Sequence, residues 1–330
     1  MALDELARED DVIYAPSSLS ASAPTPVLEL CSQINAIQDD VIIDATELAF
    51  IDPFGLAMLR ATLESQPATK KVSVRWMNEE LITYLVRMDF FEGLAVEGID
   101  TQSARNPQGE PDHCVELIRV REGNSEEIAS RLIQAMTGMC GEDETAVDEE
   151  LDADRRPIEY ALKELLENAL SHAKKEGNGN ASVWVACQHF ESNDYVRLAI
   201  VDNGCGFLAT LKGHAQLKEH THLAAIEAAL QERVSCNRGP HVGYETDSQN
   251  QGVGLTTTAR IAEAAGGLLV VASGDAWVMT SNGLEVVMEG SSWKGVAIAF
   301  TCHREKLHLI NIPSLLPEAE GVADADISFE

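Results

Sequence analysis

A short segment of the chain, ELLENALSHA from Glu164 to Ala173, carries polar residues at the spacing of a helix face. Glu164, Asn168 and His172 stand at i, i+4 and i+8, so a helix places a carboxylate, a carboxamide and an imidazole on one stripe. Such groups can hold a ligand or move a proton. A solvated helix face has the same spacing, so this stripe indicates a functional site only together with the motifs that follow it.

Two glycine motifs follow along the chain. The first, VDNGCGF, places Asp202 at the end of an expected strand with Gly204 and Gly206 directly after it. These glycines let the backbone approach a ligand closely. The second, NQGVGLTTTAR, opens an expected helix, where free N–H donors and the positive end of the helix dipole suit a phosphate group. Three such motifs in this order are strong evidence for a binding site.

The elements that must position these motifs can be read from the pattern of apolar residues. Pro157 suits the start of a helix that ends near Lys175, and two strands joined as a hairpin follow at 182–190 and 195–202. Residues 207–251 are long for a simple connection and are typical of a lid over a site. The last expected elements are a helix at 253–265 and strands at 268–273, 276–280, 284–288 and 296–301.

The N-terminal part of the chain predicts a separate, smaller domain. Apolar runs at 41–45 and 72–76 favour strands. Apolar residues at helical spacing follow at 55–63 and 81–91 and favour helices. This β-α-β-α order is typical of a layered structure, and we expect the α/β (α+β) class for the whole chain. The expected boundaries are a flexible arm at 1–25, a first domain at 26–100, a linker at 101–113, a second domain at 114–305 and a tail at 306–330.

With these motifs, residues 115–301 resemble the GHKL superfamily of ATP-binding domains. That superfamily includes type II topoisomerase, Hsp90, MutL-like and histidine-kinase ATP domains and the anti-sigma-factor serine kinases. The resemblance implies a Bergerat fold, an α/β sandwich with helices on one face of a mixed sheet, and it implies ATP and Mg²⁺ as cofactors. No segment looks like a dimerisation helix with a phosphoacceptor histidine, so autophosphorylation on histidine is not expected.

The resemblance also implies roles for individual residues. Asn168 would coordinate the Mg²⁺ that bridges the phosphates, and Glu164 would orient or deprotonate the attacking nucleophile. Asp202 would accept a hydrogen bond from the adenine amino group, while Gly204 and Gly206 would let the base pack closely. The other residues expected to contact ATP are His172 and, around the outer phosphates, Gly252, Val253, Gly254 and Leu255.

One position departs from the family's pattern. The family often has a Gly-Thr pair before the last strand, whose threonine helps to bind adenine through water. Here the matching pair is Gly295 and Val296. We therefore expect that contact to be missing.

The first domain resembles a second family. DATELAFIDPFGL, at 44–56, is similar to STAS domains, the fold of anti-sigma-factor antagonists. In antagonists the strand–helix turn reads DSSG and its second serine is phosphorylated, whereas here the turn is Asp52-Pro53-Phe54-Gly55. Phe54 cannot accept phosphate, so a phosphoswitch at this position is excluded. We expect Phe54 either to dock a partner or to lie in the core or at a domain interface.

Composition argues against several classes of function. Lys and Arg number 24 against 54 Asp and Glu, a formal charge of −30 that repels nucleic acids and anionic membranes. The acidic N-terminus does not resemble a signal peptide, no apolar run is long enough to span a bilayer, and the scattered cysteines fit a reducing compartment. We expect a cytoplasmic protein whose partners include neither nucleic acid nor membrane.

Two functions remain open on these grounds. The first is an ATP-dependent regulator that transfers phosphate to a partner protein, as a serine/threonine kinase of the anti-sigma type, or hydrolyses ATP to drive a conformational switch. The alternative is a nucleotide-gated scaffold with negligible turnover. Glu164 favours turnover, since binding alone does not require a carboxylate there. A homodimer fits either function, and no sequence feature identifies the partner or the oligomeric state.

Overall fold

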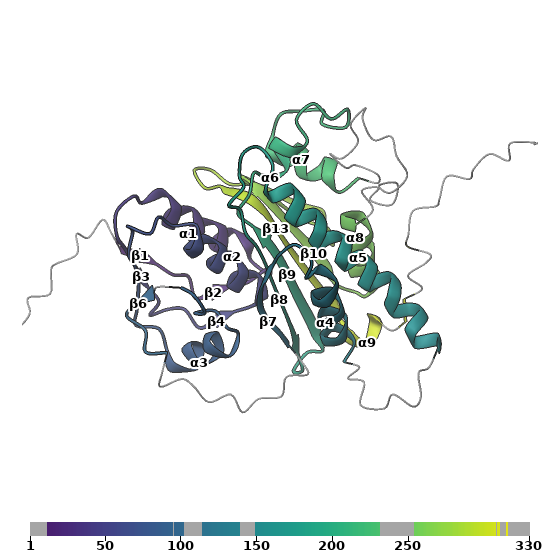
Figure 1. Cartoon of the computed structure of the whole chain (residues 1–330), viewed down its shortest axis with the longest axis horizontal. Helices are drawn as coiled ribbons and strands as arrows, with labels where there is room; N and C mark the ends of the chain where they lie inside the picture. Colours follow the sequence, from purple (N-terminus) through teal and green to yellow (C-terminus); the bar gives the residue numbers. More distant parts are fainter. Residues whose placement is uncertain are drawn as a thin grey trace, which may run out of the picture.

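The computed structural model describes residues 12–94, 96–101, 114–138, 149–231, 254–307, 309–310 and 315, and for residues 149–157 and 254 it describes the backbone alone. These residues form two packed domains of mixed helix and strand (Figure 1). The predicted α/β class is confirmed. No helix in the described part of the chain is both long and apolar enough to cross a membrane.

The N-terminal domain is built on a small parallel sheet with the strand order β1-β3-β5-β6. Its strands are β1 (Val12–Tyr14), β3 (Val41–Asp44), β5 (Val72–Arg75) and β6 (Val96–Glu97), and β2 (Ser18–Leu19) pairs separately with β4 (Phe50–Ile51). Because side chains alternate along a strand, one face of this sheet is buried and the other is not. The helices of this domain are α1 (Pro24–Ala36), α2 (Pro53–Glu64) and α3 (Glu79–Arg87).

The expected flexible arm at 1–25 does not extend over residues 12–25. Strand β1 lies in this segment and pairs in parallel with β3, with Ile13 opposite Ile43. Helix α1 begins at Pro24, where a proline suits the first turn. The prediction failed here because an apolar stretch as short as Val12–Tyr14 shows no measurable period. The expected linker at 101–113 and tail at 306–330 lie almost wholly outside the described residues.

The C-terminal domain is built on a seven-stranded sheet in the order β12-β11-β10-β13-β9-β8-β7. All pairings between its described strands are antiparallel, so the expectation of a mixed sheet is wrong for these strands. The predicted hairpin between β8 and β9 is confirmed, with Phe190 opposite Tyr195. The strands are β7 (Cys114–Val120), β8 (Val183–Phe190), β9 (Tyr195–Asp202), β10 (Leu268–Gly274), β11 (Ala276–Met279), β12 (Leu284–Val287) and β13 (Trp293–His303).

Three helices pack on one face of this sheet and form an apolar core with it. They are α4 (Ser125–Thr137), α5 (Glu149–Ala173) and α8 (Gly254–Ala264). The short helices α6 (Gly206–Thr210) and α7 (His222–Ala229) lie beside the C-terminal end of α5, and α9 (Arg304–Leu307) follows β13 (Figure 1). Helix α5 begins before the expected start at Pro157, because the Glu, Leu, Ala and Arg residues ahead of the proline favour a helix.

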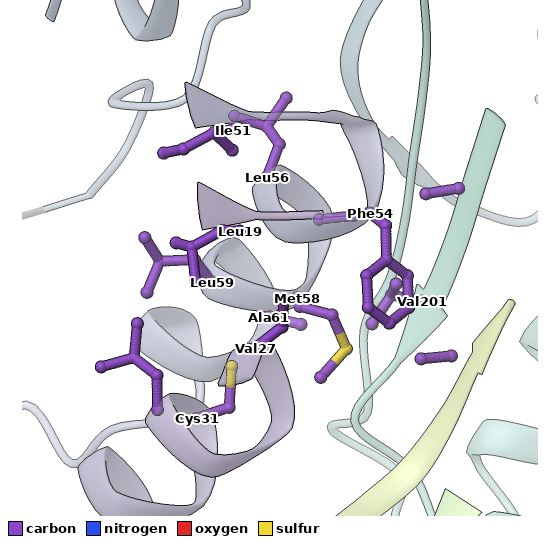
Figure 2. Close-up of a cluster of buried hydrophobic side chains, with 14 of the residues drawn as sticks. Leu19, Val27, Cys31, Ile51, Phe54, Leu56, Met58, Leu59, Ala61 and Val201 are labelled. Carbon is purple, nitrogen blue, oxygen red and sulfur yellow. The ribbon is translucent and has the colours of Figure 1, made fainter. Parts of the chain in front are cut away.

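The N-terminal domain covers the second face of the seven-stranded sheet. Helices α1 and α2 share one hydrophobic core with strands β8, β9, β10, β11 and β13. Phe54 is 1% exposed and points with Met58 toward Val201 of β9 (Figure 2). Phe54 therefore lies at the domain interface, and its burial excludes the alternative that it docks an external partner. Apart from the exposed edge strand β12, the sheet is thus buried on both faces, between helices of its own domain and helices of the other.

Hydrogen bonds reinforce this interface at several points. The Asp52 carboxylate is fully buried and caps α2, and the Arg197 guanidinium of β9 donates to it at 2.9 Å. Arg197 also lies over the rings of Phe50 and Phe190, at 5.7 and 5.0 Å. The Glu64 carboxylate accepts from the Trp184 indole at 2.8 Å. The other donors to Asp52 are the Ser20 hydroxyl and the N–H groups of Ala21, Phe54 and Gly55.

Candidate functional site

Helix α5 positions the polar stripe that the sequence predicted. Its apolar residues Leu162, Leu165 and Leu166 are buried in the core below the helix, whereas Glu164, Asn168 and His172 are half-buried. At 1.5 Å per residue, Asn168 lies about 6 Å and Glu164 about 12 Å from His172 along the helix axis. The three polar groups are therefore spread over about 12 Å of the C-terminal part of α5.

The Asp202 carboxylate lies at the end of β9 and is 3% exposed. Its Oδ1 accepts a hydrogen bond from the N–H of Gly204 at 2.8 Å, and the N–H of Val296 donates to the same carboxylate. Burial raises the pKa of Asp202 to about 7, although the two N–H donors act in the opposite direction. Val296 lacks the hydroxyl of the family's threonine, but its backbone contacts the aspartate.

The loop after Asp202 packs directly on the end of α5. A Cβ on Gly204 would lie 2.4 Å from the Cα of Ala173. Gly206 adopts φ +75°, which favours glycine, and a Cβ on Gly295 would lie 1.9 Å from the backbone oxygen of Asp202. The Cys205 thiol donates to the carbonyl of His172 at 3.4 Å. The structure thus brings the aspartate motif to the His172 end of the stripe.

This packing predicts that Gly204→Ala lowers stability by about 1–3 kcal/mol and weakens ATP binding, because the new methyl group forces the loop away from α5. The matched control is Gly179→Ala, where a Cβ would meet nothing within 4 Å. Denaturant unfolding and ATP titration of both variants test this prediction. Equal, small effects of the two substitutions would contradict it.

Tyr160 is a site residue that the sequence analysis missed. It stands one turn before Glu164 and its hydroxyl donates to the Glu164 carboxylate. Burial raises the pKa of Glu164, as does the charge of Glu167, while the bond from Tyr160 and the charge of Lys163 lower it. The i, i+4 spacing of Tyr160 and Glu164 was visible in the sequence, but a tyrosine on a helix does not by itself indicate a partner. A raised pKa makes a carboxylate a better proton acceptor.

His172 faces a different electrostatic environment. Burial and, to a smaller extent, the charge of Lys175 lower the pKa of its imidazole to about 4. The ring is therefore neutral at neutral pH. It can offer a hydrogen bond to a phosphate, but it adds no positive charge to the site.

Asn168 has a side chain that fits Mg²⁺. Within the described part of the chain no hydrogen bond to its carboxamide is found, and only its backbone oxygen accepts, from Ser171. Mg²⁺ takes oxygen ligands and is commonly held by one or two protein groups together with phosphates and water. The half-buried carboxamide oxygen of Asn168 can supply one such protein ligand. No cluster of three or more His, Cys, Asp or Glu residues that could hold a metal is found among the described residues.

The second glycine motif is described only in part. Gly252 and Val253 lie outside the described residues. Helix α8 begins at Gly254 as expected, and Leu255 is half-buried and packs in the apolar cluster beside Phe207. The expected placement of phosphates at this helix end remains a prediction.

The predicted lid at 207–251 is partly a packed structure. Helix α7 buries Ala225 and Ile226 against the sheet, and its N-terminal residue His222 contacts Asp275 of the β10–β11 turn at 2.9 Å. Phe207 donates its N–H to the Ser273 hydroxyl, which donates in turn to the carbonyl of Gly295. The first part of the expected lid is thus fixed to the sheet, and residues 232–251 lie outside the described residues.

Comparison with known families agrees with this geometry. The family model described as "Histidine kinase-, DNA gyrase B-, and HSP90-like ATPase" matches residues 153–289. The chain contains a GHKL-type ATP-binding domain. The match includes the polar stripe and both glycine motifs, but it ends before Gly295 and Val296 and leaves out β7 and α4. No curated protein and no solved structure matches the chain.

The buried Asp202 of this ATP-binding domain makes stability depend on pH. An aspartate in an unfolded chain has a pKa of about 3.9, whereas burial raises the pKa of Asp202 to about 7 in the folded protein. Folding therefore favours the protonated carboxyl. The stability that this group contributes is complete below the pKa of the unfolded chain. It is lost as the pH rises through the pKa of the folded protein.

We expect the unfolding free energy of the wild type to fall relative to Asp202→Asn between about pH 4 and pH 7, with a slope of at most about 1.4 kcal/mol per pH unit. Above about pH 7 the difference should be constant. Denaturant unfolding of both proteins without nucleotide across this range measures the effect. Parallel pH profiles would contradict the expected burial of a titrating carboxyl.

Proposed function

We propose that the protein uses Mg·ATP to transfer the γ-phosphate to a serine or threonine of a partner protein, as kinases of the anti-sigma type do. The observation that carries this proposal is the order of groups along α5: the His172 end, on which the loop after Asp202 packs, then Asn168, then Glu164. With adenine against Asp202, the phosphates would extend along the helix toward Asn168. Glu164, farther along, would face the attacking hydroxyl.

In this mechanism the residues of the chain position ATP and accept one proton. Bound Mg²⁺ would neutralise charge on the phosphates. Glu164 would accept the proton of the attacking hydroxyl while the oxygen bonds to the γ-phosphorus and ADP leaves. Tyr160 would keep the carboxylate turned toward the reacting groups, and the neutral His172 would donate a hydrogen bond to a phosphate. If water replaces the hydroxyl, the same groups catalyse hydrolysis.

The N-terminal domain supports a regulatory rather than a metabolic role for the ATPase. Its helices α1 and α2 lie against one face of a parallel sheet, and the resemblance of residues 44–56 to STAS domains suggests the same signalling context. The charge of −30 favours a protein as partner over a nucleic acid. Because of the same acidic composition, we also propose that the protein is cytoplasmic.

The test is to incubate the purified chain with γ-labelled ATP and Mg²⁺, with and without extract of the host cell, beside Asn168→Ala and Glu164→Gln. Label that moves to a protein only when Glu164 is intact supports the kinase. Release of free phosphate alone makes the protein an ATPase, and ATP binding with neither outcome supports a nucleotide-gated scaffold. Failure to bind ATP at all would overturn the proposal.

A further inference from the structure

The parallel sheet of the N-terminal domain has one face that no helix covers among the described residues. Ile43 and Val74 point to the face packed with residues of α1 and α2, where they line a small apolar cavity with Leu30. The alternate residues Ile42 and Ser73 are only half-buried and point the other way. Figure 1 shows that α1 and α2 stand between this sheet and the ATP-binding domain. The uncovered face therefore looks away from the catalytic half of the molecule.

Two large aromatic side chains are exposed at the edge of the sheet where β1 and β5 end. Tyr14, the last residue of β1, is 75% exposed, and Trp76, directly after β5, is 63% exposed. Strand β3 lies between them, because Tyr14 pairs with Asp44 and Asp44 pairs with Arg75. At about 4.8 Å between strands, the backbones of Tyr14 and Arg75 are about 10 Å apart. One segment of a partner can thus contact both rings.

The backbone conformation of Trp76 is unusual for a tryptophan whose ring is exposed. Trp76 has φ 59°, in the left-handed region that is an outlier for a bulky side chain. Burial cannot explain this conformation, since the ring is mostly in solvent. The guanidinium of the neighbouring Arg75 lies 6.0 Å from the ring centroid, so the indole already contacts a cation.

The charges around the two rings are mainly negative. Asp44 stands between them in the sheet, and the side chain of Asn78, after β5, donates to the carbonyl of Leu48, after β3, at 3.2 Å. The two loops that carry the rim are therefore adjacent. Among the described residues of these loops, the acidic ones are Asp44, Glu47, Glu79 and Glu80, of which the last three are exposed, and the one cation is Arg75. Aromatic rings with an acidic rim attract guanidinium and ammonium groups.

We propose that this surface, formed by Tyr14, Trp76 and the acidic rim, docks an arginine- and lysine-rich segment of a partner protein. Charge complementarity selects this occupant. A nucleic acid would bring more negative charge to the rim, and a second copy would bring the same rim and a charge of −30. The proposal does not depend on ATP turnover, because the surface lies on the other side of α1 and α2 from the ATP site.

The full chain can be tested with a short synthetic peptide of alternating arginine and serine. Trp184, Trp277 and Trp293 are buried, so a change of tryptophan fluorescence on titration reports on Trp76. We expect saturable binding that weakens as salt rises. By anisotropy of a labelled peptide, Trp76→Asn and the double variant Glu79→Gln/Glu80→Gln should each lose about tenfold in affinity. Asparagine tolerates the left-handed backbone, so the first variant should fold.

The matched control is Glu285→Gln/Glu289→Gln, which removes two exposed acids from the β11–β12 hairpin and its flank. This variant should bind the peptide as the wild type does. If both double variants lose affinity equally, peptide binding depends only on the total charge of the protein and the proposal is overturned. Unchanged affinity in a folded Trp76→Asn protein would overturn it as well. ATP titration of each variant should give the wild-type result, which separates this surface from the proposed enzyme function.

Discussion

Glu164→Gln is expected to lower the rate of phosphate transfer from ATP by about 10²–10⁴-fold, the usual contribution of a positioned general base. Glutamine has nearly the same shape but cannot take a proton from the attacking hydroxyl. ATP affinity should stay within a few-fold, because Glu164 lies about 12 Å along α5 from the His172 end, where the base would bind. Single-turnover rates and an ATP titration of the same preparation separate the two effects.

Glu159→Gln is the control for this experiment. It removes a half-buried carboxylate from the same helix, five residues before Glu164 and thus on another face. Its turnover should equal that of the wild type. Loss of ATP binding by Glu164→Gln would assign the residue to binding instead of catalysis, and an unchanged rate would exclude it as the base.

Asp52→Ala should be the most destabilising single substitution considered, at about 3–5 kcal/mol. The carboxylate is fully buried and accepts five hydrogen bonds, one of them from Arg197 of the other domain. Its removal leaves the Arg197 guanidinium, 19% exposed, beside two phenylalanine rings and without its carboxylate partner. The N–H groups of Phe54 and Gly55 at the start of α2 lose their acceptor at the same time.

Denaturant unfolding of the full chain measures this cost. Asp40→Ala is the control, because Asp40 also accepts a backbone N–H bond, from Lys71, but is exposed; its cost should stay below about 1 kcal/mol. A double-mutant cycle with Arg197→Met isolates the bond between the domains. A cost for Asp52→Ala as small as that of the control would show that the five bonds do not stabilise the interface.

Much of the fold could be predicted because its elements have strong local patterns. The alternation in β9 and the helical spacing in α2 were sufficient to place both elements within a few residues. Beyond the domain interface that was left open for Phe54, the packing of one domain on the other was missed, although a signal was present. Strand β8 begins VWVAC, an unbroken apolar run, and such runs are typical of strands buried on both faces.

The candidate site was predictable to a similar degree. The stripe on α5 and the aspartate motif are local patterns, so their residues could be chosen from spacing alone. The bond between Asp52 and Arg197 joins residues 145 positions apart, and no local pattern indicates it. The N–H of Val296 as a donor to Asp202 was missed for another reason: any residue offers that backbone group, so the side chain gave no signal.

The double covering of the seven-stranded sheet has a practical consequence for expression of the halves. A fragment that begins near residue 114 would leave Trp184, Trp277 and Trp293 in water, together with the alanine and methionine residues around them. An apolar surface of that kind promotes self-association. The isolated ATP-binding half should therefore aggregate or require detergent, and a soluble truncation would need polar residues at these three positions.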